Sequence, residues 1–294
     1  MEPLEAYLEA GRIAAEALKW AAQRVAPGTK VEEICDGVKG FVEAKGARLA
    51  FPCNVDIDHV AAHYTSPLAD PTVIPEGALV KVDVGVHVEG YIADTARTVC
   101  LDPEYGYLVE AAEAGLEAAI STIRPGVRAG RVGSAIESAI RARGARPVEN
   151  LTGHRLARYV VHAGKSIPNV PTPDHNVLEE GEVYAVEPFA VPVGAQGRVV
   201  DGPPSNIYRF EKKRKVSAGA RGMLRFIQGE YRSLPFASRW VLTRFPGGEG
   251  AFQELVRSRC VSGYPQLIEA SRAKVAQAEH TMVVTGDGCL VTTV

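Results

Sequence analysis

Two aspartates on neighbouring strands are the residues of this chain best suited to chemistry. Asp83 and Asp94 lie in the segment 79–100, LVKVDVGVHVEGYIADTARTVC, which reads as two strands joined at Glu89-Gly90. If Gly90 supplies a positive φ in a two-residue turn, both aspartates fall on one face as diagonal neighbours, roughly 7–8 Å apart at Cα. Two anions this close need a metal ion between them, a raised pKa on one carboxyl, or a clamp of Arg and Lys.

The same pattern predicts which residues of the two strands face each other. Alternate valines from Val80 to Val88 form one apolar face, and Asp83 points to the other face. The two-residue turn predicts three cross-strand pairs: Val88 with Tyr91, Gly85 with Asp94, and Asp83 with Ala96. A loop with an odd number of residues would instead turn Asp94 to the valine face.

Further candidate ligands follow in later segments that are patterned as strands. They are His154 and His162 in 150–167, Glu187 in 181–190, and Glu279 in 277–285. In an unbroken strand the two histidines, eight residues apart, share one face. Pro188 holds Glu187 in extended geometry, so we expect its carboxylate to be aimed in a fixed direction.

Together the two Asp, two Glu and one His form an oxygen-rich set. Such a set suits two divalent ions of the Mn, Fe or Co type better than a closed structural zinc site. Two ions ~3.5–4 Å apart would hold a bridging water, lower its pKa and polarise a carbonyl. Each residue also has an ordinary structural explanation when taken alone: a hydrogen-bonded interior histidine for His154, an edge-strand carboxylate for Glu187, and a partner of Arg272 for Glu279.

Composition indicates a soluble globular protein in a reducing compartment. The 294 residues suffice for one large domain or two ordinary ones, and no apolar run approaches the ~20 residues that span a bilayer. The N-terminus, MEPLEAYLEAGR, is acidic and helical in pattern, unlike a signal peptide. Five scattered cysteines without a C-x-x-C pair argue against a disulfide framework and a zinc knuckle. We therefore expect a cytoplasmic protein with no membrane partner.

Helical patterns flank the two strands and repeat once along the chain. Helices are expected at 2–24, 30–44, 102–124 and 130–143. Pro27-Gly28 and Gly46-Ala47-Arg48 recur 98 residues later as Pro125-Gly126 and Gly144-Ala145-Arg146, with a matching apolar ladder between them. This spacing is too long for a solenoid repeat and indicates two pseudo-equivalent halves. We expect the carboxylates of the hairpin to meet groups of the second half.

A basic segment separates Glu187 from Glu279. Between Arg209 and Arg259 there are twelve Lys and Arg against four Glu, although the whole chain carries a formal charge of −2. Short helices are expected at 223–229, 238–244 and 252–258, and a turn at 262–265, so the segment reads as a compact helical insert. Its charge is compatible with nucleic-acid binding, but no phosphate loop, RNP aromatic pattern or zinc finger supports that function, and a solvated face is the alternative.

The order of these residues resembles the methionine aminopeptidases across nearly the whole chain. The matching motifs are KVDVG with Asp83, YIADTART with Asp94, GHRLARYVVHAGK with His154 and His162, YAVEPF with Glu187, AQAEHT with Glu279, and AAHYTSP with His63. The insert is typical of the second type of that family, in its short archaeal form without an N-terminal extension. The resemblance implies an α+β pita-bread fold of two pseudo-symmetric halves, with a catalytic domain at 1–200 and 266–294 and a helical, winged-helix-like insert at 201–265.

The resemblance also implies a role for each residue. Asp83 would hold one metal ion, Asp94 and Glu279 would bridge both, and His154 and Glu187 would hold the other, with Glu187 also a proton shuttle. His63 and His162 would contact the scissile amide and the developing oxyanion. The methionine side chain would lie against Phe51, Val161, Phe189 and Tyr264. Some members of the family have a histidine that lines the pocket in the segment corresponding to 205–208, and this chain has none there. The resemblance therefore does not predict the detailed shape of the methionine pocket.

The implied activity is removal of the initiator methionine from nascent polypeptides with a small second residue. Two divalent ions, Co, Mn, Fe or Zn, would serve as cofactors, and the enzyme would act as a monomer, with a possible ribosome contact through the basic insert. Two alternatives remain: proline-specific peptidases such as prolidase and aminopeptidase P, which share the five ligands, and a non-catalytic binding module of the same fold, against which the complete ligand set argues.

Overall fold

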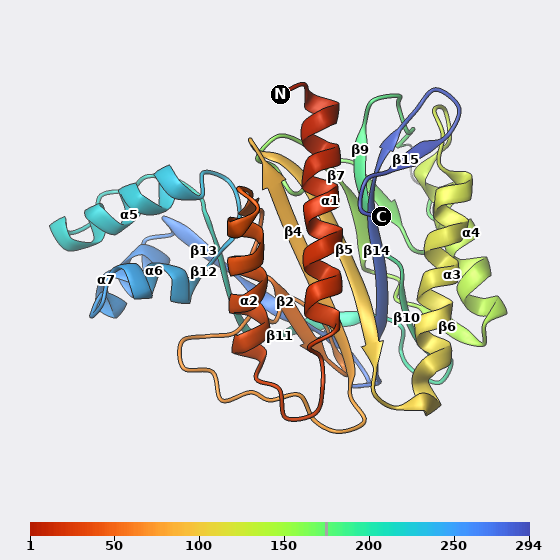
Figure 1. Ribbon diagram of the computed structural model, residues 1–294, viewed down its shortest axis with the longest axis horizontal. Coiled ribbons are helices and arrows are strands. Elements are labelled where there is room, and N and C mark those ends of the chain that lie inside the picture. Colours follow the sequence, from red (N-terminus) through yellow and green to blue (C-terminus); the bar gives the residue numbers. More distant parts are fainter. Residues whose placement is uncertain (174–175) are drawn as a thin grey trace.

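The hairpin that carries Asp83 and Asp94 forms in the predicted register. In the computed structural model, which describes residues 1–173 and 176–294 (Figure 1), β4 (Leu79–Val88) pairs antiparallel with β5 (Tyr91–Cys100). Gly85 lies opposite Asp94, and Asp83 lies opposite Ala96. Glu89 and Gly90 both have positive φ, 52° and 93°, as a primed two-residue turn requires. The predicted pairing is confirmed.

This hairpin belongs to an eleven-stranded sheet that runs through both halves of the chain. The central order is β1-β4-β5-β14-β9-β7-β8, and β2, β6, β10 and β15 attach at the sides. Besides β4 and β5 its strands are β1 (Arg48–Leu49), β2 (Asn54–Ile57), β6 (Ala145–Pro147), β7 (Thr152–Leu156), β8 (Ser166–Pro168), β9 (Val183–Val186), β10 (Phe189–Pro192), β14 (Ala276–Val284) and β15 (Cys289–Val291). The two halves meet where β5 pairs with β14.

Two helix pairs cover one face of the sheet, in front of it in Figure 1. They are α1 (Pro3–Ala22) with α2 (Val31–Ala44), and α3 (Gly106–Thr122) with α4 (Ala129–Ala142), each within a few residues of its predicted bounds. α1 and α2 pack on the valine face of β4, and α3 and α4 pack on β9 and β14. Among the described residues, no helix combines the length and apolarity needed to cross a bilayer. All five cysteines are free.

The predicted repeat corresponds to a structural repeat. Gly28 and Gly126 both have a φ of 83°. The N–H of Gly28 donates to Ile74 O at 2.8 Å, and the N–H of Gly126 donates to Leu178 O at 2.9 Å. Because the same turn makes the same contact in both halves, the two pseudo-symmetric halves of the predicted α+β fold are present.

The basic segment folds beside the main sheet, at the left of Figure 1. It contains α5 (Ala218–Glu230), α6 (Ser238–Arg244) and α7 (Glu249–Arg257), close to the three predicted helices. It is not only helical, because a four-stranded sheet joins β12 (Phe236–Ala237), β11 (Val199–Phe210), β13 (Val261–Glu269) and β3 (Val60–Ala62). The turn predicted at 262–265 is wrong, since these residues lie within β13. The domain limits at 201 and 265 stay a prediction, because β11 and β13 run across them.

Candidate metal centre and active site

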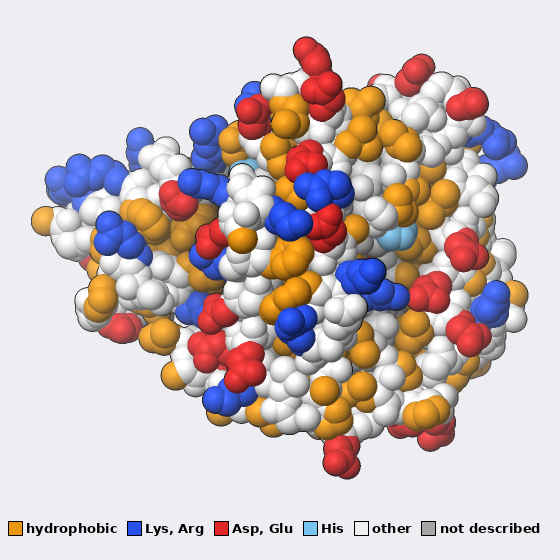
Figure 2. Space-filling model, viewed as in Figure 1, with side chains coloured by type: hydrophobic (Ala, Val, Ile, Leu, Met, Phe, Trp, Pro, Cys, Tyr) orange, Lys and Arg blue, Asp and Glu red, His pale blue; other side chains and the backbone are white. Residues whose placement is uncertain are grey.

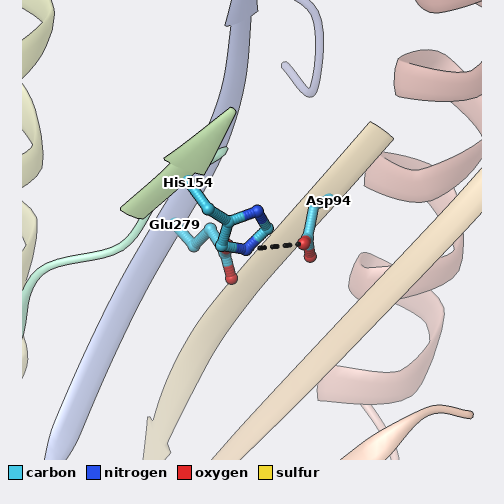
Figure 3. Close-up of side chains that lie close together, drawn as sticks. All are labelled: Asp94, His154 and Glu279. Atoms are coloured by element: carbon cyan, nitrogen blue, oxygen red, sulfur yellow. Dashed lines mark ion pairs between the residues drawn. The ribbon is translucent and has the colours of Figure 1, made fainter. Parts of the chain in front are cut away.

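Three of the predicted ligands converge from three strands. Asp94 on β5, His154 on β7 and Glu279 on β14 each offer a ligand atom, and these atoms all lie within 4.8 Å of one another (Figure 3). Asp83 on β4 contacts the Asp94 carboxyl, and Glu187 follows directly after β9. The site therefore draws on both halves of the fold, as the repeat predicted.

Threonine side chains hold β5 and β14 together beside these carboxylates. The N–H of Asp94 donates to Thr281 Oγ1 at 2.7 Å, and that hydroxyl donates to Asp94 O at 2.8 Å. Thr95 Oγ1 donates to Glu279 O at 2.8 Å. Regular pairing of β5 with β14 extends over only two residue pairs, so these hydroxyls continue the connection between the strands. They fix the backbone on both sides of Asp94 and Glu279.

His154 presents the tautomer that a metal ligand needs. Its Nδ1 lies 2.7 Å from Val161 O and donates to it, which leaves the Nε2 lone pair free. Nε2 lies 3.6 Å from Asp94 Oδ2 and 3.5 Å from Glu187 Oε1. Burial, with a contribution from His162, lowers the pKa of His154 to about 3, so the ring is neutral at physiological pH.

The four carboxyl groups are crowded and buried, so their ionised forms are disfavoured without a positive charge beside them. Burial raises the pKa of Asp83 to about 7, and burial together with the neighbouring carboxylates raises the pKa values of Asp94, Glu187 and Glu279 well above their ordinary range. Among the described residues, no Lys or Arg forms an ion pair with any of them. The clamp of basic residues considered from the sequence is therefore not what holds these carboxyls together.

Buried oxygen atoms in the same place lack partners. Within the part of the chain that the structure describes, Asp83 Oδ1 and Asp94 Oδ1 are buried without a hydrogen-bond donor. The Asn54 side-chain amide donates to Asp83 Oδ2 at 3.4 Å, and the Gln277 side-chain amide donates to Glu279 Oε2 at 3.2 Å. Each amide therefore reaches only one oxygen of its carboxyl group. Carboxylate oxygens and one neutral imidazole left without partners fit a divalent transition-metal ion.

A cavity opens directly onto this cluster. Its lining contains all five predicted ligands, both histidines predicted to be catalytic, and three of the four residues predicted to contact methionine. The lining residues are Phe51, Asn54, Ala62, His63, Asp83, Asp94, His154, Val161, His162, Glu187, Ile207, Pro235, Tyr264 and Glu279. Ile207 and Pro235 were not predicted, since neither stands in a motif. Phe189 is absent from this lining: it is fully buried and packs with Val148, Val191 and Val275. Its placement contradicts the predicted contact with methionine.

His63 and His162 line the cavity beside the cluster. His63 has a φ of 74°, its Nδ1 lies 3.2 Å from Pro265 O, and its ring stands edge-on to Tyr264 with centroids 5.6 Å apart. The ring of His162 lies 4.3 Å from that of His154. Burial lowers the pKa of His63 and that of His162, so both rings are neutral near pH 7.

His162 reaches this position by a route that the sequence did not predict. The strand expected at 150–167 is broken into β7 and β8, which pair antiparallel, and His162 lies in the loop between them. A tight turn in which Val160 N–H donates to Ala157 O, with Tyr159 at a φ of 60°, starts this loop. The two histidines are therefore neighbours across a loop and not on one strand face.

Comparison with known proteins agrees with this arrangement. Residues 5–286 match metallopeptidase family M24. The chain is 44% identical to a methionine aminopeptidase of Pyrococcus horikoshii, with 99% of each chain covered, and 39% identical to one of Saccharolobus solfataricus, with 99% of this chain and 98% of that one covered.

Solved structures share the fold at low identity. A thermophilic Arx1 superposes with a TM-score of 0.85 at 18% identity, over 99% of this chain and 90% of that one. A prolidase of Pyrococcus furiosus gives 0.65 at 18% identity, over 100% of this chain and 64% of that one. These likenesses concern the pita-bread architecture alone. The match over 5–286 and the full-length relatives show more: the chain belongs to metallopeptidase family M24, in which it is a metal-dependent aminopeptidase.

Proposed function

We propose that this enzyme removes the initiator methionine from nascent polypeptides whose second residue is small. The observation that carries the proposal is a single cavity that joins an apolar recess to the converging ligands. Phe51, Val161 and Ile207 line the recess, and the carboxylates line its other side. An unbranched, apolar methionine side chain suits such a recess, and its scissile amide then lies beside the ligands. The full-length relatives named methionine aminopeptidase support the same substrate.

Two divalent ions fit the ligand set better than one. Asp83, Asp94, His154, Glu187 and Glu279 would hold them, with Asp94 and Glu279 shared between the two ions. When bound, the ions supply an activated water and polarise the scissile carbonyl. The set offers four carboxyl groups and one imidazole, more donors than one ion with an open water position needs. The native metal, Co, Mn, Fe or Zn, is a matter for elemental analysis.

The neutral histidines orient the substrate. His63, fixed by Pro265 O at Nδ1, turns Nε2 towards the cavity, where it can bond the scissile amide. His162 lies beside His154 and can donate to the oxygen on which negative charge develops. Glu187 lies 3.5 Å from His154 Nε2, and its buried carboxyl can carry a proton to the leaving amine.

The partners follow from the substrate. Nascent N-termini are found at the ribosome in the cytoplasm, and we place the enzyme there, acting as a monomer of the second type. Lys and Arg side chains gather over the insert, at the left of Figure 2, and the run 212–215 is exposed. This surface is suited to ribosomal RNA. Co-sedimentation with ribosomes should fall steeply as salt rises, and no pelleting at low salt would remove the proposed contact.

Peptide cleavage tests the proposed function. Purified enzyme supplied with Mn, Fe or Co should release methionine from Met-Ala-Ser and should leave Ala-Pro dipeptides and Met-Leu-Ser largely intact. Preferential cleavage of Ala-Pro would assign the chain to the proline-specific peptidases instead. No cleavage of either peptide with any of these metals would reject both.

A further inference from the structure

Arg209 stands beside the cavity on the strand that helps to line it. In β11, Ile207 and Arg209 lie two residues apart and point to one side, whereas Tyr208 points to the other. Ile207 lines the cavity. Tyr208 packs into the core of the insert, with ring centroids 4.9 Å from Phe252 and 6.4 Å from Phe236. The side of β11 that carries Arg209 is therefore the side that faces the active site.

Contacts with active-site residues place the guanidinium at the cavity's edge. Arg209 Cζ lies 5.7 Å from the ring centroid of Tyr264, and Tyr264 in turn stands edge-on to His63. The charge of Arg209 also contributes to the lowered pKa of His162. Arg209 is thus a positive charge close to Tyr264, His63 and His162, all of which line the cavity.

The guanidinium is held from one side and open to solvent on another. Its Nε donates to Glu211 Oε1 at 2.7 Å, and the same oxygen accepts from Ser262 Oγ at 2.5 Å. The Arg209 side chain is 49% exposed. A guanidinium fixed at Nε keeps its two terminal nitrogens as a fork, which matches the two oxygens of a carboxylate. Tyr264 is a second hydrogen-bond partner of the guanidinium. Glu211 and Tyr264 together orient this group, and its half-exposed side keeps N–H donors for a second carboxylate.

We propose that Arg209 is a specificity residue that favours substrates with a carboxylate shortly after the second residue. This inference rests on the proposed function, since it requires methionine to occupy the apolar recess and the rest of the peptide to leave past the rim. One extended residue spans about 3.3–3.6 Å, so the third and fourth residues are the first that can clear the cavity. The carboxylate comes from an acidic side chain at one of these positions or from the C-terminus of a short peptide.

Matched amidated peptides separate these sources. The first pair is Met-Ala-Asp-Gly-amide with Met-Ala-Asn-Gly-amide, and the second pair carries Asp or Asn at the fourth residue. In low salt, kcat/KM should favour Asp over Asn by about three-fold in at least one pair, the size expected for a half-exposed charge pair. Met-Ala-Gly as free acid against amide tests the C-terminal carboxylate in the same way.

Variants of Arg209 test whether its side chain causes the preference for Asp over Asn. Arg209→Gln should bring the Asp-to-Asn ratio to about one, and Arg209→Glu should invert it. Arg225→Gln, an exposed change on α5, is the matched control and should keep the wild-type ratio. Equal loss of activity on all peptides in Arg209→Gln would mean that Arg209 only supports Tyr264, and would overturn the proposal.

Different results would contradict the proposed function and the proposed role of Arg209. If wild-type enzyme releases no methionine from any of these peptides, the proposed function is wrong. If it releases methionine with the same kcat/KM from the Asp, Asn, acid and amide forms, the function holds and the role of Arg209 is wrong.

Discussion

Asp94→Asn should stabilise the metal-free protein at alkaline pH while it abolishes metal-dependent activity. Burial, and after it the neighbouring carboxyls of Asp83 and Glu187, raise the pKa of Asp94 well above its ordinary range. In the metal-free fold the group therefore keeps its proton to higher pH than it does in the unfolded chain. A carboxyl with a raised pKa in the folded state contributes stability at low pH, and this stability is lost as the pH rises towards that folded pKa.

The magnitude follows from the pH window. One proton held only in the fold changes the free energy of unfolding by at most 1.36 kcal/mol per pH unit, so the limit for Asp94 between pH 6.5 and 8.5 is about 2.7 kcal/mol. Asp83, with a pKa of about 7, loses about 0.8 kcal/mol in the same window. Lys81, whose pKa is lowered to about 8 by burial, acts in the opposite direction. Wild type and Asp94→Asn share Lys81 and Asp83, so their difference reports the contribution of Asp94 within the cluster.

Calorimetry on chelator-treated protein measures this difference. At roughly 2 °C per kcal/mol for a chain of this size, the Tm of Asp94→Asn relative to wild type should rise from pH 6.5 to 8.5, by up to about 5 °C. Added Mn or Co should raise the wild-type Tm and have a much smaller effect on the variant. A variant whose metal-free Tm follows the wild type at every pH would refute the account of the cluster as mutually repelling carboxyls.

Four other substitutions test the metal ligands, the methionine pocket and the surrounding scaffold separately. His63→Ala should keep its bound metal and lose about 10²–10³ in kcat, whereas His154→Ala should lose metal and activity together, as elemental analysis and kinetics will show. Gly85→Ala would place a Cβ 2.1 Å from Phe51 Cε1, so it should displace that ring and lower kcat/KM for methionine peptides by about ten-fold without loss of metal. Asp56→Ala removes the acceptor, at 2.7 Å, of the backbone N–H that follows His63, and should cost about 1–3 kcal/mol in urea unfolding and reduce kcat with metal retained.

The hairpin could be predicted from the sequence because its register depends only on the length and residues of its turn. A two-residue turn with glycine leaves one register, and that register decides which faces Asp83 and Asp94 take. The contact of Phe189 with methionine, which the resemblance implied, has a different outcome: Phe189 is fully buried away from the cavity. Pro188 lies between the end of β9 and the start of β10, where the chain leaves one pairing and begins another, so the alternation of faces is interrupted.

Tertiary pairing explains the other differences. His162 stands in a loop because β7 folds back onto β8, a pairing that no residue pattern in 150–167 announces. Residues 262–265 look like a turn through Gly263 and Pro265, yet they form strand because β11 supplies the partner. Ile207 and Pro235 enter the cavity only because the insert docks there. None of these features depends on local propensity alone.

The structural repeat relates Asp83 to Glu187, a relation that the sequence concealed. A single bridge closes each helix pair against a following segment, Lys30 with Val73 in one half and Arg128 with Val177 in the other. Lys30 and Arg128 lie 98 positions apart in the sequence, whereas Val73 and Val177 lie 104 apart. The second half has six more residues between these positions, so the strands repeat at a spacing of 104 and the helices at 98. The fixed spacing of 98 found in the sequence therefore relates only the helices.

At the larger spacing the equivalent positions carry chemistry. Gly77 and Gly181, 104 apart, both have positive φ, 66° and 82°, and lead into β4 and β9. Six residues after each glycine stand Asp83 and Glu187. Each half therefore presents one carboxylate at the same place, on opposite sides of the contact between β5 and β14 that carries Asp94 and Glu279. Asp83 and Glu187 thus lie on either side of Asp94 and Glu279. This arrangement is the one expected for two ions, and it supports the proposed dinuclear centre.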